Sequence, residues 1–222
     1  MCGRFALTLP NDAMAQLFDA APHNALPDTP RYNICPTQEV AVVTSQNGAR
    51  ALRPMRWGFV PQWYKTVSGG PLLINARAET IADKPAFAKA VRTRRCVIPA
   101  TSFFEWTKEG EDKLPWSIAR KDTQPMMFAG LWQDWRGPED ALLTTCAIVT
   151  CAASPDLSAL HHRMPVILEP ASLALWLGEA GHGAAPLMRA TPAGTLTWHR
   201  VTAQVNRARG NEPAFLDPIP TP

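Results

Sequence analysis

The sequence predicts a single α+β domain whose strands pair mainly antiparallel, and three observations lead to this prediction. Most local signals are short strands in consecutive runs, without the regular helical crossovers of a parallel sheet. The 22 prolines and 13 glycines are spread through the chain, so they mark many turns and form no linker. A length of 222 residues with 46% hydrophobic content is enough for one substantial core.

Alternating or apolar segments bounded by turn signals predict the strands. The segment RFALT lies near the start of the chain. Residues 39–45 pass through the turn signal QNG at 46–48 into a returning strand at 49–59. Further strands are expected at residues 71–76, 95–100, 103–107, 114–119, 126–135 and 142–150.

Three segments predict helices. Residues 11–20 begin with Asn11, which we expect to be the N-cap. Residues 84–95 place two large apolar residues four positions apart, and residues 170–180 begin with a proline, which suits a first helical turn. The helices are few and peripheral to the strand pattern.

Composition excludes several classes of protein. The net charge of +3 is compatible with a nucleic-acid partner without requiring one. No stretch approaches the ~18 apolar residues of a membrane span, and no basic segment followed by an apolar run marks a signal peptide. We therefore expect a cytoplasmic protein that does not contact a membrane.

The five cysteines are odd in number and contain no C-x-x-C pair. Without a secretory signal, this pattern argues against a disulfide framework. Cys146 and Cys151 lie in an apolar run, where thiols pack as small hydrophobic groups. A zinc site that combines them with His161 or His162 is a weaker alternative, because the ligand spacing is loose.

Three polar residues stand in or beside apolar strand segments. Asn75 follows the apolar run PLLI, Glu105 lies between aromatic residues in SFFEWT, and His161 precedes the apolar segment MPVIL. Each also has a structural interpretation. Asn75 can cap a turn, Glu105 can face outward from an edge strand, and a histidine beside a strand is more often structural than catalytic.

The arginines fall into two groups. Those within residues 92–95 cluster at the end of a predicted helix, where they complement the helix dipole and stay solvated. Arg4, Arg77 and Arg163 each lie close in sequence to one of the suspected polar residues or to Cys2. If they converge in space, they form an anion site.

The segment RWGFVPQWY is rich in large rings. Trp57 lies in a predicted strand and is expected in the core. Trp63 follows Pro61 in a predicted loop, where an exposed ring can stack on nucleic-acid bases or simply pack against the protein.

Cys2 stands directly behind Met1. Removal of Met1 before so small a residue leaves a free α-amine and a thiol on one residue. This 1,2-aminothiol is chemically distinctive, because neither a lysine nor an internal cysteine has both groups on one residue.

The motifs together resemble the SRAP family, the SOS response-associated peptidase-like proteins. MCGRF, RYNICPTQ, MRWGFVPQW, INARAET, RRCVIPATSFFEW and HHRMPVIL occur in the family's order and approximate spacing, over roughly residues 2–205. The resemblance implies one α+β domain on a curved, barrel-like, mainly antiparallel sheet with peripheral helices. It places an SRAP-like domain at 2–205. The remaining residues, 206–222, are polar and rich in proline, which predicts an extended, partly mobile tail.

The resemblance also implies a function. Family members sense abasic sites in single-stranded DNA, link to them covalently through the N-terminal cysteine, and shield them as a thiazolidine. On this basis Cys2 is the nucleophile, Asn75 orients the sugar or the amine, Glu105 exchanges protons with the amine, and His161 assists opening of the sugar ring. The remaining family positions are the expected DNA contacts: Arg4, Arg77, Arg163 and Trp63.

Two other functions stay open. Cys2, His161 and Glu105 can form a thiol autopeptidase limited to N-terminal self-processing, and the arginines with Trp63 can form a non-covalent reader of single-stranded DNA. Lyase or nuclease activity is a weaker third option, since the thiol is suited to intercept the imine it needs. We expect no metal or other cofactor, and a monomer that associates with the nucleoid when it is bound to DNA.

Overall fold

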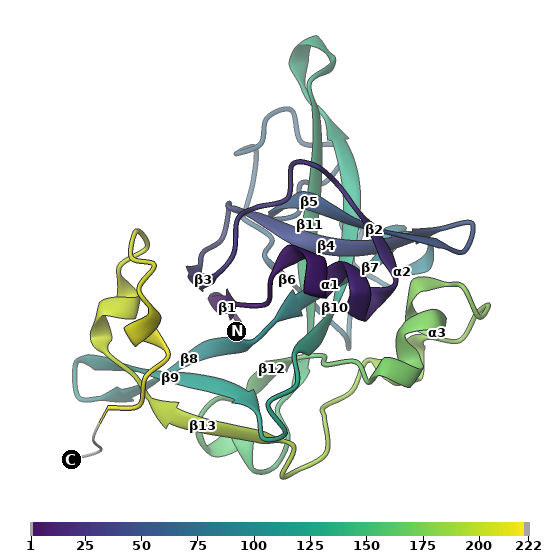
Figure 1. Cartoon of the computed structure of the whole chain (residues 1–222). Helices are drawn as coiled ribbons and strands as arrows, with labels where there is room; N and C mark the ends of the chain where they lie inside the picture. Colours follow the sequence, from purple (N-terminus) through teal and green to yellow (C-terminus); the bar gives the residue numbers. More distant parts are fainter. Residues whose placement is uncertain (1, 220–222) are drawn as a thin grey trace.

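β-Strands dominate the computed structural model, which describes residues 2–219 (Figure 1). The strands are β1 (Phe5–Leu7), β2 (Ala20–Pro22), β3 (Arg31–Ile34), β4 (Glu39–Gln46), β5 (Ala49–Trp57), β6 (Asn75–Arg77), β7 (Arg95–Ala100), β8 (Ser102–Glu109), β9 (Asp112–Arg120), β10 (Met126–Arg136), β11 (Leu142–Ala152), β12 (Arg163–Pro165) and β13 (Leu196–Arg200). The α-helices are α1 (Asn11–Phe18), α2 (Ala90–Thr93) and α3 (Leu173–Leu177). The α+β class is confirmed.

The larger sheet closes on itself into a barrel. Its strands follow the order β12-β11-β10-β7-β4-β5-β2, and β11 also pairs with β5. This last pairing is parallel and joins Thr145 to Arg56 and Cys146 to Trp57. The strands β11, β10, β7, β4 and β5 therefore form a closed ring, and the predicted curved, barrel-like, mainly antiparallel sheet is confirmed.

The smaller sheet packs against the barrel through aromatic side chains. Its order is β13-β9-β8-β1-β3. Phe5 of β1 lies with its ring centroid 5.1 Å from Trp57 of β5 and 6.0 Å from Phe128 of β10, and Phe103 of β8 lies 6.1 Å from Phe128. These edge-to-face contacts bury large apolar surfaces and fix how the two sheets meet. Trp57 is fully buried, as predicted.

Two short strands flank the last part of β11. On β11, Thr150 pairs with Arg77 of β6 and with Pro165 of β12, so β11 runs between them. β6 is parallel to β11 and β12 is antiparallel to it. This arrangement brings the INARAET and HHRMPVIL motifs, which lie far apart in sequence, to opposite sides of one strand.

The helices are shorter than the sequence predicts. Pro10 is the N-cap of α1, and the side chain of Asn11 instead donates a hydrogen bond to the Pro27 carbonyl, so the predicted Asn11 cap is wrong. In the segment 84–95 only Ala90–Thr93 is α-helical, and turns fill the residues before it. The strand predicted at 71–76 is displaced, because its regular pairing begins at Asn75.

The segment after β13 folds back onto the small sheet. Two 3₁₀ turns, Ala203–Asn206 and Pro213–Phe215, lie in it, and Phe215 is only 2% exposed. Phe215 packs in a small cluster with Phe104 and Val205. The described part of the predicted tail is therefore anchored and not extended, because Phe215 packs against the small sheet. The polar residues around Phe215 in the sequence give no sign of this contact. Residues 220–222 lie outside the described residues.

Candidate functional site

Cys2 lies buried at the start of the small sheet, just before β1. Its side chain is fully buried, and its thiol is 3.9 Å from the Arg4 carbonyl oxygen. The carbonyl oxygen of Cys2 accepts a hydrogen bond of 2.9 Å from the side-chain nitrogen of Asn75. Asn75 therefore ties the N-terminal segment to β6, and through β6 to the barrel.

The amide of Asn75 has a fixed orientation. Only its nitrogen can donate to the Cys2 carbonyl, so its oxygen Oδ1 must point the other way. Oδ1 is buried and has no hydrogen-bond partner among the described residues. Buried polar atoms are normally paired, so this acceptor is available to an amine or a hydroxyl group beside Cys2.

Glu105 projects from β8 toward the barrel. Successive residues of a strand face opposite sides, and the neighbouring Phe103 and Phe104 pack in different clusters accordingly. Glu105 shares the side of Phe103 and is 3% exposed, so the alternative of an outward-facing edge position is wrong. Burial raises the pKa of its carboxyl to about 7.

His161 faces Glu105 from the segment that leads into β12. Its Nδ1 lies 3.6 Å from Oε1 of Glu105. The same nitrogen lies 3.1 Å from the Arg163 amide nitrogen and 2.9 Å from the Arg163 carbonyl oxygen. It can therefore accept from the amide when unprotonated, or donate to the carbonyl when protonated. Burial lowers the pKa of His161, which favours the neutral ring at pH 7.

The pair of Glu105 and His161 is suited to proton transfer. A carboxyl with a pKa of about 7 is partly protonated at neutral pH, so it can give a proton as readily as it can take one. The facing atoms of the two groups, Nδ1 of His161 and Oε1 of Glu105, lie 3.6 Å apart. Glu105 also acts electrostatically on the Cys2 thiol, so the pair can provide general acid–base chemistry at Cys2 in a site that largely excludes water.

The thiol of Cys2 is not prepared to act as a thiolate. Burial raises its pKa above the usual range, and the nearby Glu105 carboxylate raises it further. Reactive cysteines in thiol hydrolases have the opposite environment, with a lowered pKa. The burial of this thiol therefore argues against a reaction that begins with a thiolate at Cys2.

The predicted arginines have different surroundings. Arg4 donates to Oδ1 of Asn33 at 2.8 Å and to the Val205 carbonyl at 2.6 Å. Arg163 is buried and forms a two-pronged ion pair with Glu79. Arg77 is exposed. Phosphate contact stays a prediction for all three, and Arg77 presents its charge to solvent most directly.

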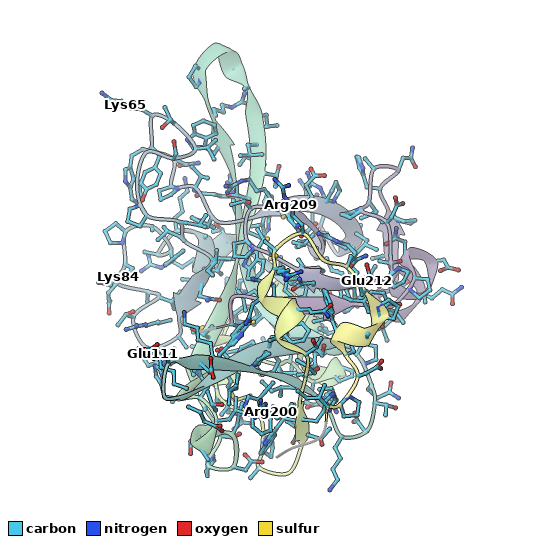
Figure 2. The ribbon with its side chains drawn as sticks, turned by 90° about the vertical axis from the view of Figure 1, so that its left-hand side faces the viewer. Lys65, Lys84, Glu111, Arg200, Arg209 and Glu212 are labelled. Atoms are coloured by element: carbon cyan, nitrogen blue, oxygen red, sulfur yellow. The ribbon has the colours of Figure 1, made fainter. Side chains whose placement is uncertain are left out.

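A groove of about 630 Å³ opens beside Asn75. Trp63, which is 59% exposed in the loop after β5, lines it together with Arg77, Lys84 and Phe87. Figure 2 shows Lys65 and Lys84 extending from the same edge of the molecule. Aromatic surface bordered by cations suits a single nucleic-acid strand, whose bases stack while its phosphates meet the positive charge.

Sequence reasoning missed Glu79 and Lys84. The signal for Glu79 was present, because in NARAE the polar residues Asn75, Arg77 and Glu79 alternate with alanines, which places them on one side of an extended strand. Lys84 carries no such signal, since it reaches the groove only through the turns before α2. Arg95 was expected to be solvated, but it contacts the ring of Trp176 and donates to its carbonyl.

The part of the chain that the structure describes has neither a metal-binding cluster nor a membrane-spanning helix. No three His, Cys, Asp or Glu side chains gather there in a group that could hold a metal ion. No helix among residues 2–219 is both long and apolar enough to cross a membrane. All five cysteines are free and buried.

Known proteins resemble the chain along almost its whole length. The family described as SOS response associated peptidase (SRAP) matches residues 1–208. Abasic site processing protein YoqW of Bacillus subtilis is 34% identical, over 98% of this chain and 99% of its own length. Abasic site processing protein YedK of Escherichia coli is 31% identical, over 99% of this chain and 100% of its own length. The rat protein HMCES, of the same description, is 30% identical, over 98% and 76%.

Solved structures share the fold. A crystal structure of a protein from Bacteroides thetaiotaomicron superimposes with a TM-score of 0.86 at 22% identity, covering 98% of this chain and 100% of the other. A crystal structure of a protein from Bordetella bronchiseptica superimposes with a TM-score of 0.79 at 23% identity, covering 90% of this chain and 100% of the other. At these identities the likeness concerns the fold alone.

Proposed function

Because the chain belongs to the SOS response associated peptidase (SRAP) family, we propose that it captures abasic sites in single-stranded DNA through a covalent bond to Cys2. The named relatives are abasic site processing proteins, which supports this class of substrate. The contact that carries the proposal is the hydrogen bond from Asn75 to the Cys2 carbonyl, which holds Cys2 where the charge of Glu105 acts on its thiol. Glu105 in turn faces His161 at 3.6 Å.

The reaction begins at the α-amine that removal of Met1 exposes. The open-chain sugar of an abasic site carries an aldehyde, which the neutral amine attacks to give a carbinolamine. Loss of one water then yields an imine. The Cys2 thiol adds to the imine carbon, its proton passes to the nitrogen, and a five-membered thiazolidine closes. Two bonds to the former aldehyde carbon form and one molecule of water leaves.

Glu105 is suited to carry the proton transfers of this reaction. It accepts a proton from the attacking amine and returns one to the departing hydroxyl, and both directions are accessible to a carboxyl whose pKa burial raises to about 7. Asn75 holds the residue through its nitrogen and offers Oδ1 to the amine or to a sugar hydroxyl. His161 assists opening of the sugar ring, with its Nδ1 held against the Arg163 backbone.

The groove beside Asn75 accommodates the strand next to the abasic site. Trp63 offers a ring for base stacking, and Arg77 with Lys84 offers positive charge to the phosphates. Arg4 and Arg163 lie closer to the buried groups and already have protein partners. We therefore assign most of the direct phosphate contact to the groove.

The two alternatives have weaker support. A thiol autopeptidase needs a thiolate, and the burial that raises the pKa of Cys2 opposes one. A non-covalent reader of single-stranded DNA needs only the groove and does not account for a buried acid–base pair beside Cys2.

Intact-protein mass spectrometry tests the proposal. The purified protein is measured before and after incubation with a single strand that carries one abasic site, and with the undamaged strand as control. We expect a mass that lacks Met1, followed by a denaturation-resistant adduct with the damaged strand that is one water lighter than the sum. A protein that lacks Met1 and never forms the adduct would favour the autopeptidase or the passive reader.

A further inference from the structure

An ion pair spans β11 between the two motifs that carry the site residues. Arg163 of β12 donates to the Glu79 carboxylate through both terminal nitrogens, at 2.7 and 3.0 Å. One of these nitrogens also donates to the Thr150 carbonyl on β11, at 2.8 Å. The Arg163 side chain is 11% exposed and that of Glu79 is 49% exposed. The guanidinium therefore crosses the strand to a carboxylate at the surface.

This clamp of Arg163 and Glu79 connects the two halves of the site. Glu79 follows β6, the strand that begins with Asn75, and the Ala78 amide between them donates to the Thr150 carbonyl at 2.8 Å. Arg163 holds Nδ1 of His161 through its own backbone, at 2.9 and 3.1 Å. Fixing the Arg163 side chain thus fixes the backbone groups that orient the imidazole.

The clamp also sets the charge around His161. The Arg163 cation contributes to the lowered pKa of His161. The other charged or titratable groups near the ring are Glu105 from β8 and His162, the next residue in the chain. The Glu79 carboxylate partly compensates the Arg163 charge, and its own pKa is lowered by the hydrogen bonds from Arg163.

We propose that Glu79 is a positioning residue for the reaction at Cys2, acting through Arg163 on His161 and through β6 on Asn75. This inference rests on the proposed function. Glu79 itself does not touch the reacting atoms. Because Arg163 is buried, removal of the carboxylate leaves an uncompensated guanidinium beside the imidazole, and the loss is felt at the chemical step.

A second ion pair with two hydrogen bonds, outside the site, provides the control. Glu179 binds Arg50 with two hydrogen bonds, at 2.8 and 2.7 Å, and shares no residue with the site. The variants Glu79→Gln and Glu179→Gln each remove one carboxylate charge from a paired arginine. Any general consequence of losing a carboxylate from an arginine pair appears in both.

Two measurements distinguish a positioning role of Glu79 from a purely structural one. The first is the single-turnover rate of adduct formation as a function of DNA concentration. We expect Glu79→Gln to lower the maximal rate by between about tenfold and a hundredfold, as misplacement of a catalytic group does, without raising the half-saturating concentration. The second is the NMR titration of the His161 ring in the free protein, where Glu79→Gln should lower its pKa below the wild-type value.

Either of two results would overturn the proposal: equal maximal rates in the two variants, or a His161 titration in Glu79→Gln that coincides with wild type. If the wild-type protein forms no adduct at all, the proposed function fails. The clamp is then judged by the titration alone, so the two failures are distinguishable.

Discussion

The junction between the two sheets and the interior of the barrel both contain buried thiols, and they differ in what surrounds the sulfur. Cys2, Cys96 and Cys146 are all fully buried, and burial raises the pKa of each thiol. Cys96 packs so closely that a Cβ added to Gly130 would lie 2.9 Å from its sulfur. Beside Cys2 stand an amide with a free acceptor and a carboxyl that titrates near neutral pH.

This difference teaches that burial alone does not make a cysteine reactive. The thiols of Cys96 and Cys146 pack as small apolar groups, and burial raises the pKa of the Cys2 thiol as it raises theirs. What distinguishes the junction is a set of groups that can move protons beside Cys2. In the proposed reaction, the reactivity of Cys2 therefore comes from these neighbours and from the α-amine that removal of Met1 exposes.

Replacing the two thiols gives the largest expected contrast. Cys2→Ala should abolish the heat-stable adduct, because its α-amine can form only an imine, while affinity for the single strand stays near wild type. The imine should still be trapped by borohydride. Cys96→Ala should form the adduct normally and lose roughly 1–2 kcal/mol of folding free energy. Denaturing gels with and without borohydride, and thermal melts, provide the readouts, and a heat-stable adduct in Cys2→Ala would refute the thiazolidine.

Glu105 provides the next contrast, between buried and exposed carboxyls on one strand. Glu105→Gln keeps the shape of the side chain but cannot exchange protons, so the maximal single-turnover rate should fall by about 10²- to 10⁴-fold. Glu109 lies further along β8 and is exposed, so Glu109→Gln is the matched control and should react at the wild-type rate. Similar rates for the two variants would remove Glu105 from the mechanism.

The raised pKa of Glu105 also predicts how stability depends on pH. In the folded protein the carboxyl titrates near pH 7, against 4.5 without the fold. Between these values the folded state binds more protons than the unfolded state, so stability falls as pH rises through this window. At 1.36 kcal/mol per pKa unit, wild type should lose about 3 kcal/mol relative to Glu105→Gln between pH 4 and pH 8. Denaturant unfolding at several pH values measures this, and a constant difference would contradict the buried, uncharged carboxyl.

The sequence predicts which residues lie at the junction between the two sheets better than it predicts the contacts between them. Strand periodicity placed most barrel strands, and the ordered motifs singled out Cys2, Asn75, Glu105 and His161, of which the structure links Cys2 to Asn75 and Glu105 to His161. The barrel closure between β5 and β11 depends on a parallel pairing of distant segments. No local pattern encodes such a register.

The same reasoning explains why the clamp and the folded C-terminal segment were not predicted. Glu79 contacts Arg163 only because β6 and β12 flank the same strand, β11. This arrangement is a property of the tertiary fold and has no local sequence signal. Phe215 is a single apolar residue among polar and proline neighbours, a composition typical of a mobile tail. Its burial depends on a cluster that the small sheet completes.

Two exposed side chains, one inside the groove beside Asn75 and one outside it, give the smallest expected difference, which is a difference in DNA affinity. Trp63 and Leu142 are each 59% exposed, but Trp63 lines the groove beside Asn75, while Leu142 begins β11 at the base of the protruding hairpin tip (Figure 1). Trp63→Ala should weaken binding to undamaged single-stranded DNA by about 1–3 kcal/mol, the contribution of one stacked base. Leu142→Ala should leave binding unchanged, and both variants should melt near the wild-type temperature because neither side chain is buried. Fluorescence anisotropy with a labelled oligonucleotide measures the difference. Equal affinities of Trp63→Ala and wild type would place the strand outside the groove, and the phosphate contacts would then fall to Arg4 and Arg163.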